Sequence, residues 1–298
     1  MANTHTGLHR RIVVLIPYLW LIVFFLTPFL IVFKISLSEP TLAQPPYLPV
    51  FDSLADTLDK IRQLSFQNYA WLSQNALYWK AYLSSLWIAG LSAAIALLVG
   101  FPLAYGMARA PKGLRTLLVV LIILPFWTSF LIRVYAWIGI LRPEGLLNQF
   151  LLWLGLQPLA ISNTNTAVII GIVYSYLPFM VLPLYASLEK LDESLLEAAA
   201  DLGATPRAAF WRITVPLAFP GMVAGLMLVF IPAVGEFVIP DLLGGSETLM
   251  IGRTLWSEFF QNRDWPVASA VAVLLVLVLV VPIVLFQNAQ ARVRGSSI

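Results

Sequence analysis

Long uncharged stretches alternate with short polar connections along this chain. A helix needs about 20 apolar residues to cross the hydrocarbon layer of a bilayer. Because an open strand would leave backbone N–H and C=O groups unsatisfied in lipid, each stretch of this length is predicted to be a helix. Arg133 alone interrupts one of them. The six predicted spans are Ile12–Phe33, Ala81–Ala108, Thr116–Leu141, Ala167–Leu188, Ile213–Gly235 and Trp265–Ala291.

The composition excludes a water-soluble protein. Of the 298 residues, 60% are hydrophobic and 11% are charged, whereas soluble domains have roughly 45–50% and about 25%. We therefore expect an all-α integral membrane protein with one transmembrane domain, residues 12–291, between an N-terminal tail, 1–11, and a C-terminal tail, 292–298. Cysteine is absent, which excludes disulfides, thiolate metal sites and cysteine nucleophiles. His5 and His9 are the two histidines, both in the N-terminal tail, and no metal site is expected.

Two apolar segments need a separate interpretation. The first span follows His9, Arg10 and Arg11 and so resembles a signal peptide. It is longer than the usual apolar region of about 7–15 residues, and no small-x-small cleavage site follows it, so we interpret it as an uncleaved anchor. The stretch Gly145–Leu156 is also uncharged, but it is short and precedes a polar patch. It is predicted to be an interfacial helix outside the membrane.

The charges in the connections predict the orientation of the chain. The N-terminal tail, residues 109–115, residues 189–212 and the C-terminal tail together carry ten Lys or Arg and five Asp or Glu. The opposite side, which includes the long loop 38–80, carries seven and nine. The excess of positive charge on the first side places both termini in the cytoplasm.

The cytoplasmic connection 189–215 is longer than a turn requires and has a helical pattern of its own. Asp192 and Glu193 favour a helix N-terminus, and Gly203 is typical of a helix end. Thr205 and Pro206 then predict a second helix, as its N-cap and first residue. A short amphipathic helix beneath a membrane domain is suited to docking in a groove of a soluble partner. Its apolar stripe consists of Leu195, Leu196, Ala199 and Leu202.

This connection resembles the EAA motif of ABC importer permeases: Glu-Ala-Ala, three residues, Gly, nine residues, then Ile-x-Leu-Pro. Val215 stands where Leu is usual. The resemblance implies the type I permease fold, in which this segment is the coupling helix and sits in a groove of the ATP-hydrolysing subunit. It also implies that Glu197 and Gly203 shape that contact. The matching positions are Glu197, Ala198, Ala199, Gly203, Ile213 and Pro216.

The chain has no nucleotide-binding loop of its own. A Walker A motif requires Gly before Lys, and none of the five lysines follows a glycine. We therefore expect no enzymatic activity and no cofactor in this chain, with ATP and magnesium bound by a separate subunit. The resemblance implies an ABC ATPase dimer, a second and related permease chain in a heterodimer, and a periplasmic binding protein that delivers the solute. It also implies transport by alternating access.

Further segments resemble the polyamine importers of the same family, and the putrescine permeases in particular. They are Thr27–Ser36, Leu124–Trp137 and Phe230–Pro240, with continuations at Leu242–Gly245 and Asn262–Pro266. The resemblance implies import of polyamines, putrescine first, through the bacterial inner membrane. The sequence of this chain alone does not distinguish a putrescine importer from a spermidine importer, because the delivery protein and the second permease also contribute to selectivity.

A diamine is a dication at neutral pH and is best met by carboxylates and aromatic faces. An ionisable residue at membrane depth indicates function, so Glu236 is the first candidate to contact the cation. It could instead form a buried ion pair with Arg133, and the aromatic residues could belong to ordinary interfacial belts. The candidate path residues are Glu236, Asp241, Glu258, Trp127, Tyr135, Trp137, Tyr174 and Tyr176.

Prolines interrupt the third, fourth and fifth predicted spans. A proline inside a span frees backbone carbonyls, which protein or a water-filled cavity must satisfy. Broken helices often mark transport paths, and a packing kink explains any single proline equally well. The prolines are Pro125, Pro178, Pro183, Pro232 and Pro240.

Other interpretations fit the sequence less well. A permease for another small solute keeps the coupling loop and changes only the substrate. A lipid-modifying membrane enzyme would need clustered His, Asp, Glu or Cys near one interface, whereas these carboxylates are scattered. A channel or ion-driven carrier would need an internal repeat or charges in several spans. The loop 189–215 could also be an ordinary helical hairpin, and its net negative charge excludes a DNA-binding motif.

Overall fold

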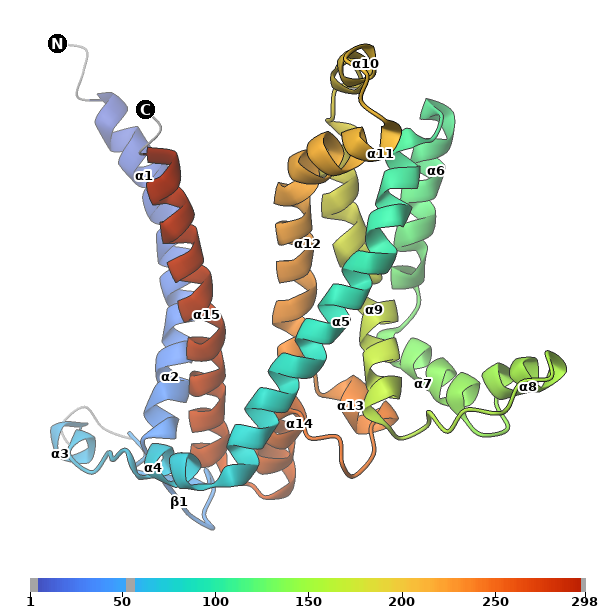
Figure 1. The fold of residues 1–298 in the computed structure, drawn as a ribbon. Coiled ribbons are helices and arrows are strands. Elements are labelled where there is room, and N and C mark those ends of the chain that lie inside the picture. Colours follow the sequence, from blue (N-terminus) through green and yellow to red (C-terminus); the bar gives the residue numbers. More distant parts are fainter. Residues whose placement is uncertain (1–4, 52–56, 296–298) are drawn as a thin grey trace. The chain divides into compact units, whose positions relative to one another are not determined.

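The chain folds into two compact units, each described here by itself. The computed structural model describes residues 5–51 and 57–295, with the side chains of 13–51, 59–280 and 283–284. The terminal unit comprises Met1–Trp79 and Leu255–Ile298, and the central unit comprises Lys80–Thr254 (Figure 1). Parts of the two predicted tails, 1–4 and 296–298, lie outside the described residues.

The terminal unit pairs the first and last helices of the chain. Helices α1 (His5–Leu21) and α2 (Thr27–Ser36) are joined by a π-helical turn, Ile22–Leu26. Helix α2 packs against α15 (Trp265–Gly295) (Figure 1). The apolar side chains between Val13 and Leu26 are exposed. Since they are exposed, they are suited to contact with lipid or with another subunit.

Short elements join α2 to the central unit. An antiparallel hairpin of β1 (Glu39–Pro40) and β2 (Tyr47–Leu48) is followed by α3 (Thr57–Ile61) and α4 (Gln67–Gln74). The buried side chain of Asn68 donates to the carbonyl oxygens of Ser36 and Ser38, at 2.8 Å each. These bonds fasten α4 to the end of α2.

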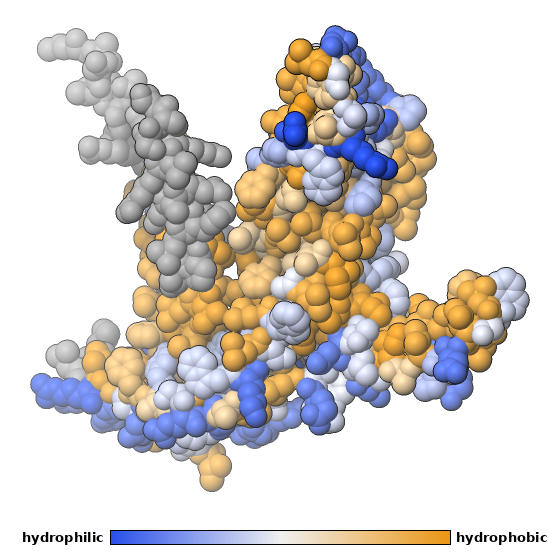
Figure 2. Space-filling view, viewed as in Figure 1, coloured by the Kyte–Doolittle hydropathy of each residue, from blue (hydrophilic) through white to orange (hydrophobic). Residues whose placement is uncertain are grey.

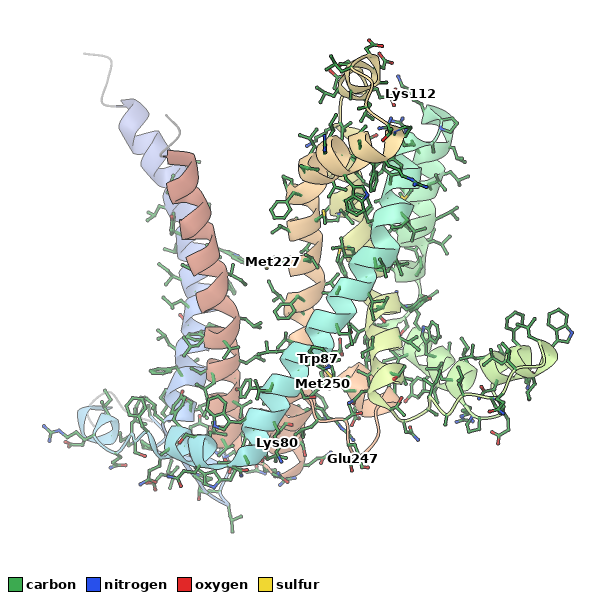
Figure 3. All side chains as sticks on the ribbon, in the orientation of Figure 1. Lys80, Trp87, Lys112, Met227, Glu247 and Met250 are labelled. Carbon is green, nitrogen blue, oxygen red and sulfur yellow. The ribbon has the colours of Figure 1, made fainter. Side chains whose placement is uncertain are left out.

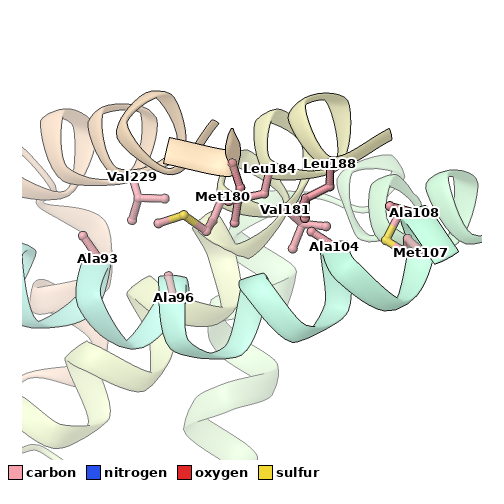
Figure 4. Close-up of a cluster of buried hydrophobic side chains, with 11 residues drawn as sticks. Ala93, Ala96, Ala104, Met107, Ala108, Met180, Val181, Leu184, Leu188 and Val229 are labelled. Carbon is pink, nitrogen blue, oxygen red and sulfur yellow. The ribbon is translucent and has the colours of Figure 1, made fainter. Parts of the chain in front are cut away.

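The central unit is built around three long helices, α5, α9 and α12, whose contacts bury its main core (Figure 4). Met180, Val181 and Leu184 of α9 lie in the middle of this core, against alanines of α5 and Val229 of α12. The helices of the unit are α5 (Ala76–Arg109, which begins in the terminal unit), α6 (Lys112–Ile123), α7 (Phe130–Leu141), α8 (Leu146–Trp153), α9 (Asn165–Glu189), α10 (Ser194–Asp201), α11 (Pro206–Ala209), α12 (Val215–Val234), α13 (Val238–Leu243) and α14 (Ile251–Trp256).

Glycines allow α12 to approach the backbone of α9. Gly221 and Gly225 lie one turn apart on α12, in the small-xxx-small spacing that brings membrane helices together. A Cβ added to Gly221 would lie 2.7 Å from the carbonyl oxygen of Pro183. A Cβ on Gly225 would lie 2.7 Å from Met180 Sδ and 3.1 Å from the Met180 carbonyl oxygen. The contact therefore requires glycine at both positions.

The predicted third span, Thr116–Leu141, is broken near Pro125, one of the prolines expected to interrupt a span. After α6 the chain forms a 3₁₀ turn, Leu124–Trp127, and then two extended residues, Thr128 and Ser129, before α7 begins. The segments Lys112–Trp127 and Phe130–Trp153 meet at 89°. Pro125 lacks an N–H, and the hydroxyl of Thr128 donates to its carbonyl oxygen at 2.8 Å. The proline and the side-chain bond together end the helix.

The other predicted spans are helices. In the described part of the chain four helices are long and apolar enough to cross a membrane, and the bent pair would make five. The sixth predicted span lies within α15, a helix of 31 residues whose described apolar stretch is Trp265–Val280. In Figure 2 apolar residues cover the long helices of the central unit and polar residues gather at their ends. Helix α8 is a separate short helix, as expected, and its interfacial position stays a prediction.

The close approach of α9 and α12 gives a prediction. Replacing Gly221 with alanine should destabilise the protein by about 1–3 kcal/mol, because the new methyl group overpacks against backbone. Gly106→Ala is the matched control, since a Cβ there meets nothing within 4 Å and alanine is the better helix former by roughly 0.5–1 kcal/mol. Thermal unfolding followed by tryptophan fluorescence in detergent should show a lower midpoint for Gly221→Ala only. Equal midpoints for the two variants would contradict the packing argument.

Candidate functional site

Helix α10 ends in a bonded glycine turn. Gly203 adopts a φ of +79°, and its N–H donates to the Ala200 carbonyl oxygen at 2.8 Å. The N–H of Ala204 donates to the Ala199 carbonyl oxygen at 2.9 Å. This pair of bonds is the Schellman arrangement, which satisfies the last carbonyls of a helix and favours glycine for its left-handed conformation. The predicted helix and its glycine end are therefore confirmed, and the motif glycine has a structural reason.

The predicted apolar stripe of α10 is divided between two environments. Leu196 and Ala199 are half-buried, whereas Leu195 is 44% exposed and Leu202 is 89% exposed. Glu197 and Ala198 are also exposed. Helical geometry places Glu197 away from the half-buried side. Helix α10 therefore exposes leucine on one side and the Glu197 carboxylate on another.

The segment after α10 is fastened to the central core. The hydroxyl of Thr205 accepts from the Ala208 N–H at 3.3 Å, so it caps α11 as predicted. Phe210, in the π-helical turn Phe210–Thr214, packs edge-on against Phe101 and Tyr105 of α5. The last two motif positions follow: Ile213 is half-buried in the π-helical turn, and Pro216 is exposed at the start of α12.

An ion pair connects α5 to the residues before α10. Arg109 and Glu193 are 3.3 Å apart and largely solvated, so the pair contributes little to stability. Asp192 accepts a hydrogen bond from the Ser194 N–H at 3.0 Å, and this bond lowers the pKa of Asp192. The N-terminus of α10 thus carries an ionised carboxylate, as the sequence pattern predicts.

A cavity of about 530 Å³ lies near the other end of the α9–α12 pair. Figure 3 shows Lys112 at the end of the central unit that carries α10, with Lys80 and Glu247 at the opposite end. Three phenylalanines and three polar or charged side chains line much of the cavity. They are Phe126, Phe130, Phe179, Arg133, Tyr176 and Glu236.

Glu236 is buried, and both of its carboxylate oxygens accept hydrogen bonds. Oε1 accepts from the N–H groups of Phe237, Val238 and Ile239, at 3.1, 3.0 and 3.4 Å. The hydroxyl of Tyr176 donates to Oε2. Since the first N–H groups of a helix otherwise lack partners, Glu236 acts as the cap of α13. Two predicted path residues, Glu236 and Tyr176, are thus brought together.

Arg133 lines the same cavity without a direct ion pair to Glu236. Within the described residues no salt bridge involves Arg133, and its buried Nε has no hydrogen-bond partner. Its guanidinium lies over the rings of Phe126 and Phe130, at 5.1 and 5.8 Å from their centres. Aromatic faces therefore stabilise this charge. The alternative of a buried Arg133–Glu236 ion pair is wrong for this conformation, because the backbone and Tyr176 already occupy the carboxylate.

The remaining path candidates of the central unit lie in different surroundings. Asp241 is half-exposed and pairs with Arg253, Nε to Oδ1, at 3.2 Å. Trp137 and Tyr174 pack edge-on with their ring centres 5.3 Å apart. Trp127 is 78% exposed and Tyr135 is 58% exposed, so neither is enclosed by this chain.

Glu258 belongs to the terminal unit and is held by its own neighbours. The hydroxyl of Tyr78 donates to Oε1 at 2.8 Å, and the amide of Asn262 donates to Oε2 at 2.8 Å. Nearby Asp264 accepts from the Val267 N–H at 3.0 Å, at the start of α15. Burial, with a smaller contribution from the charge of Glu258, raises the pKa of Asp264. Glu258 therefore accepts hydrogen bonds from Tyr78 and Asn262 within the terminal unit.

Sequence reasoning missed the aromatic wall of the cavity. Phe126, Phe130 and Phe179 were indistinguishable from lipid-facing residues, because nothing local marks a ring that faces inward. Arg133 was a signal for these rings, because a charged side chain within an apolar span needs partners that stabilise it. Aromatic faces are one such kind of partner.

Comparison with known proteins identifies the family. The family described as "Binding-protein-dependent transport system inner membrane component" matches residues 96–294. The spermidine/putrescine transport system permease protein PotB of Salmonella typhimurium (strain LT2) is 40% identical over 96% of this chain and 95% of its own length. PotB of Escherichia coli (strain K12) is 41% identical over 91% of this chain and 94% of its own length.

A solved structure supports the fold independently. A bacterial ABC transporter involved in the import of the acidic polysaccharide alginate superposes with a TM-score of 0.69 and 20% identity, over 96% of this chain and 97% of that one. The fold is thus that of a type I ABC importer permease, as the coupling-loop resemblance implies. The chain belongs to the inner membrane components of binding-protein-dependent transport systems, the permeases of ABC importers.

Proposed function

We propose that this chain is the membrane-spanning subunit of an ATP-driven polyamine importer, with putrescine as its preferred substrate. The observation that supports the polyamine class is the 40% identity to a spermidine/putrescine permease over 96% of the chain. The preference for putrescine rests on the segments, such as Leu124–Trp137, that resemble putrescine permeases. A shared fold alone would not identify a substrate, since one fold serves many functions. Both termini are proposed to lie in the cytoplasm, where the basic connections are.

The exposed face of α10 supports docking to a separate ATPase. Leu202 is 89% exposed and Leu195 is 44% exposed, and Glu197 is exposed on another side of the same helix. An ATPase dimer, which holds ATP and magnesium, is proposed to receive α10 in a groove. A second, related permease chain and a periplasmic delivery protein complete the proposed transporter. Nucleotide-driven movement of α10 would then reach the core through Phe210 and α12.

The cavity beside Glu236 suits passage of an organic dication. Its aromatic rings and its carboxylate are groups that stabilise ammonium ions. Arg133 adds a positive charge to the same cavity. The two opposite charges leave it close to neutral, which favours a step that releases the cation over a tight binding site. A buried cation would also suit a polar or anionic solute, so another small solute is the second candidate.

The docking role of Leu202 gives a prediction. Leu202→Asp should weaken association with the ATPase roughly tenfold or more, because a buried leucine contributes about 1.5–3 kcal/mol. Co-purification of the tagged permease with its ATPase measures this directly. Leu42→Asp is the matched control, since Leu42 is fully exposed at the β1–β2 hairpin. Unchanged recovery of the ATPase with Leu202→Asp would remove α10 from the interface.

The charge of Glu236 gives a second prediction. Glu236→Gln keeps an oxygen for the α13 N–H groups but removes the negative charge, and should lower the uptake rate of a dication about tenfold or more. Tyr176→Phe removes one hydrogen bond and keeps the charge, so its effect should be smaller. Asp241→Asn, which alters a half-exposed carboxylate already paired with Arg253, should have little effect. Equal uptake by wild type and Glu236→Gln would reduce Glu236 to its capping role.

Transport itself provides the direct test of the substrate. Membrane vesicles that contain the chain with its co-purifying partners should take up labelled putrescine only when ATP and the delivery protein are present. Spermidine should compete only in excess. If spermidine competes at equal concentration, the polyamine class stands and the putrescine preference is wrong. If an ATPase co-purifies and no polyamine enters, the substrate assignment is wrong.

A further inference from the structure

Helix α7 brings a positive charge into a cavity that is proposed to pass cations. Arg133 of this helix is 8% exposed and lines the cavity together with Glu236. Helix α7 packs against α9, which carries Tyr176, and against α13, which Glu236 caps (Figure 1). The arginine and the carboxylate therefore belong to the wall of the same cavity.

The charge of Arg133 is not neutralised by a neighbouring carboxylate. Its side chain forms no ion pair within the described part of the chain, and its buried Nε has no hydrogen-bond partner there. The faces of Phe126 and Phe130 stabilise the guanidinium, but a ring carries no net negative charge. Since a charge in surroundings of low dielectric constant is weakly screened, its field extends into the cavity.

The surroundings of Arg133 make its charge unfavourable for folding. Removal of a guanidinium from water costs free energy, and aromatic faces without a hydrogen bond to Nε offset that cost only in part. An unbranched apolar side chain would occupy the same place without this cost. An ionisable group at membrane depth indicates a function, and the function that this arrangement offers is electrostatic.

The two fixed charges of the cavity act in opposite directions on a polyamine. Glu236 attracts each ammonium group and Arg133 repels each one, so both effects grow with the number of charges on the solute. Among the described residues that line the cavity, Glu236 is the single carboxylate. A trication therefore brings an additional ammonium that meets the repulsion of Arg133 without a carboxylate of its own.

We propose that Arg133 is a specificity-determining residue that disfavours trications relative to dications in the cavity. This inference rests on the proposed function, because it requires that polyamines pass the cavity. It adds to that function the side chain that favours putrescine, a dication, over spermidine, a trication. Loss of the charge of Arg133 relaxes the preference, and loss of the charge of Glu236 strengthens it.

Uptake of the two polyamines by variants of the complete transporter tests the proposal. Vesicles with the same delivery protein and ATP receive labelled putrescine or spermidine at limiting concentration, so the selectivity of the delivery protein cancels between variants. Arg133→Met should raise the spermidine-to-putrescine ratio of uptake rates about tenfold, the effect of one additional charge roughly 12 Å from a guanidinium at an effective dielectric constant of about 20. Glu236→Gln should lower the same ratio, because a trication loses more attraction than a dication.

Two controls separate charge from size and from general damage. N-butylputrescine has the length of spermidine but a methyl group in place of the terminal amine, so it is a dication. Its uptake relative to putrescine should be equal in wild type and Arg133→Met. Arg142→Met removes an exposed arginine that follows α7 and does not line the cavity, and it should leave the spermidine-to-putrescine ratio unchanged.

Each outcome decides between a charge effect and a structural role. An equal spermidine-to-putrescine ratio in wild type and Arg133→Met, or an equal loss of both rates, would overturn the inference and leave the importer assignment intact. A parallel rise for N-butylputrescine would overturn it as well, since Arg133 would then act through size. If Arg133→Met does not fold, an unchanged ratio in Glu236→Gln overturns the dependence on charge number. If wild type imports neither polyamine, the proposed function itself is wrong, and the inference is wrong with it.

Discussion

The packing of α9 on α12 is the contact on which both candidate sites depend. Gly221 and Gly225 bring the two backbones together, and Met180 fills the core beside them. In a membrane no hydrophobic force drives one apolar helix onto another, so close van der Waals contact supplies the attraction. A side chain at either glycine would separate the helices and remove that attraction.

Each end of this helix pair carries one site. The segment that contains α10 leaves the C-terminal end of α9 and returns through α11 to the start of α12. At the other end α12 leads directly into Glu236, whose partner Tyr176 belongs to α9. The 25 residues of α9 span roughly 37 Å at 1.5 Å per residue. A rigid pair of this length gives a physical route by which movement of α10 would reach the cavity.

The buried charges of the cavity are stabilised separately. Glu236 uses the N–H groups of α13 and the hydroxyl of Tyr176, while Arg133 uses the rings of Phe126 and Phe130. A direct ion pair between Arg133 and Glu236 would neutralise both charges and would interact only weakly with an ion in the cavity. Separate stabilisation leaves both groups on the cavity wall.

Local sequence determined the features that arise from short-range chemistry. Apolar runs determined the long helices, Thr205 and Pro206 determined the start of α11, and Gly203 determined the end of α10, because each effect acts within a turn or two of the chain. The EAA spacing also determined the family, since it is read along one segment.

Tertiary structure decided what depends on residues far apart in the chain. The proline at position 125 was visible as a possible break, but only the fold showed that the chain turns sharply after it while Pro178 and Pro183 leave α9 continuous. Glu236 was recognisable as a buried charge and its capping of α13 is local, but its hydrogen bond from Tyr176, 60 residues away, is decided by the packing of α9. Whether a charge at membrane depth meets an opposite charge, a backbone N–H or an aromatic ring depends on which helices pack together. The residue pattern along one helix does not determine which other helices pack against it.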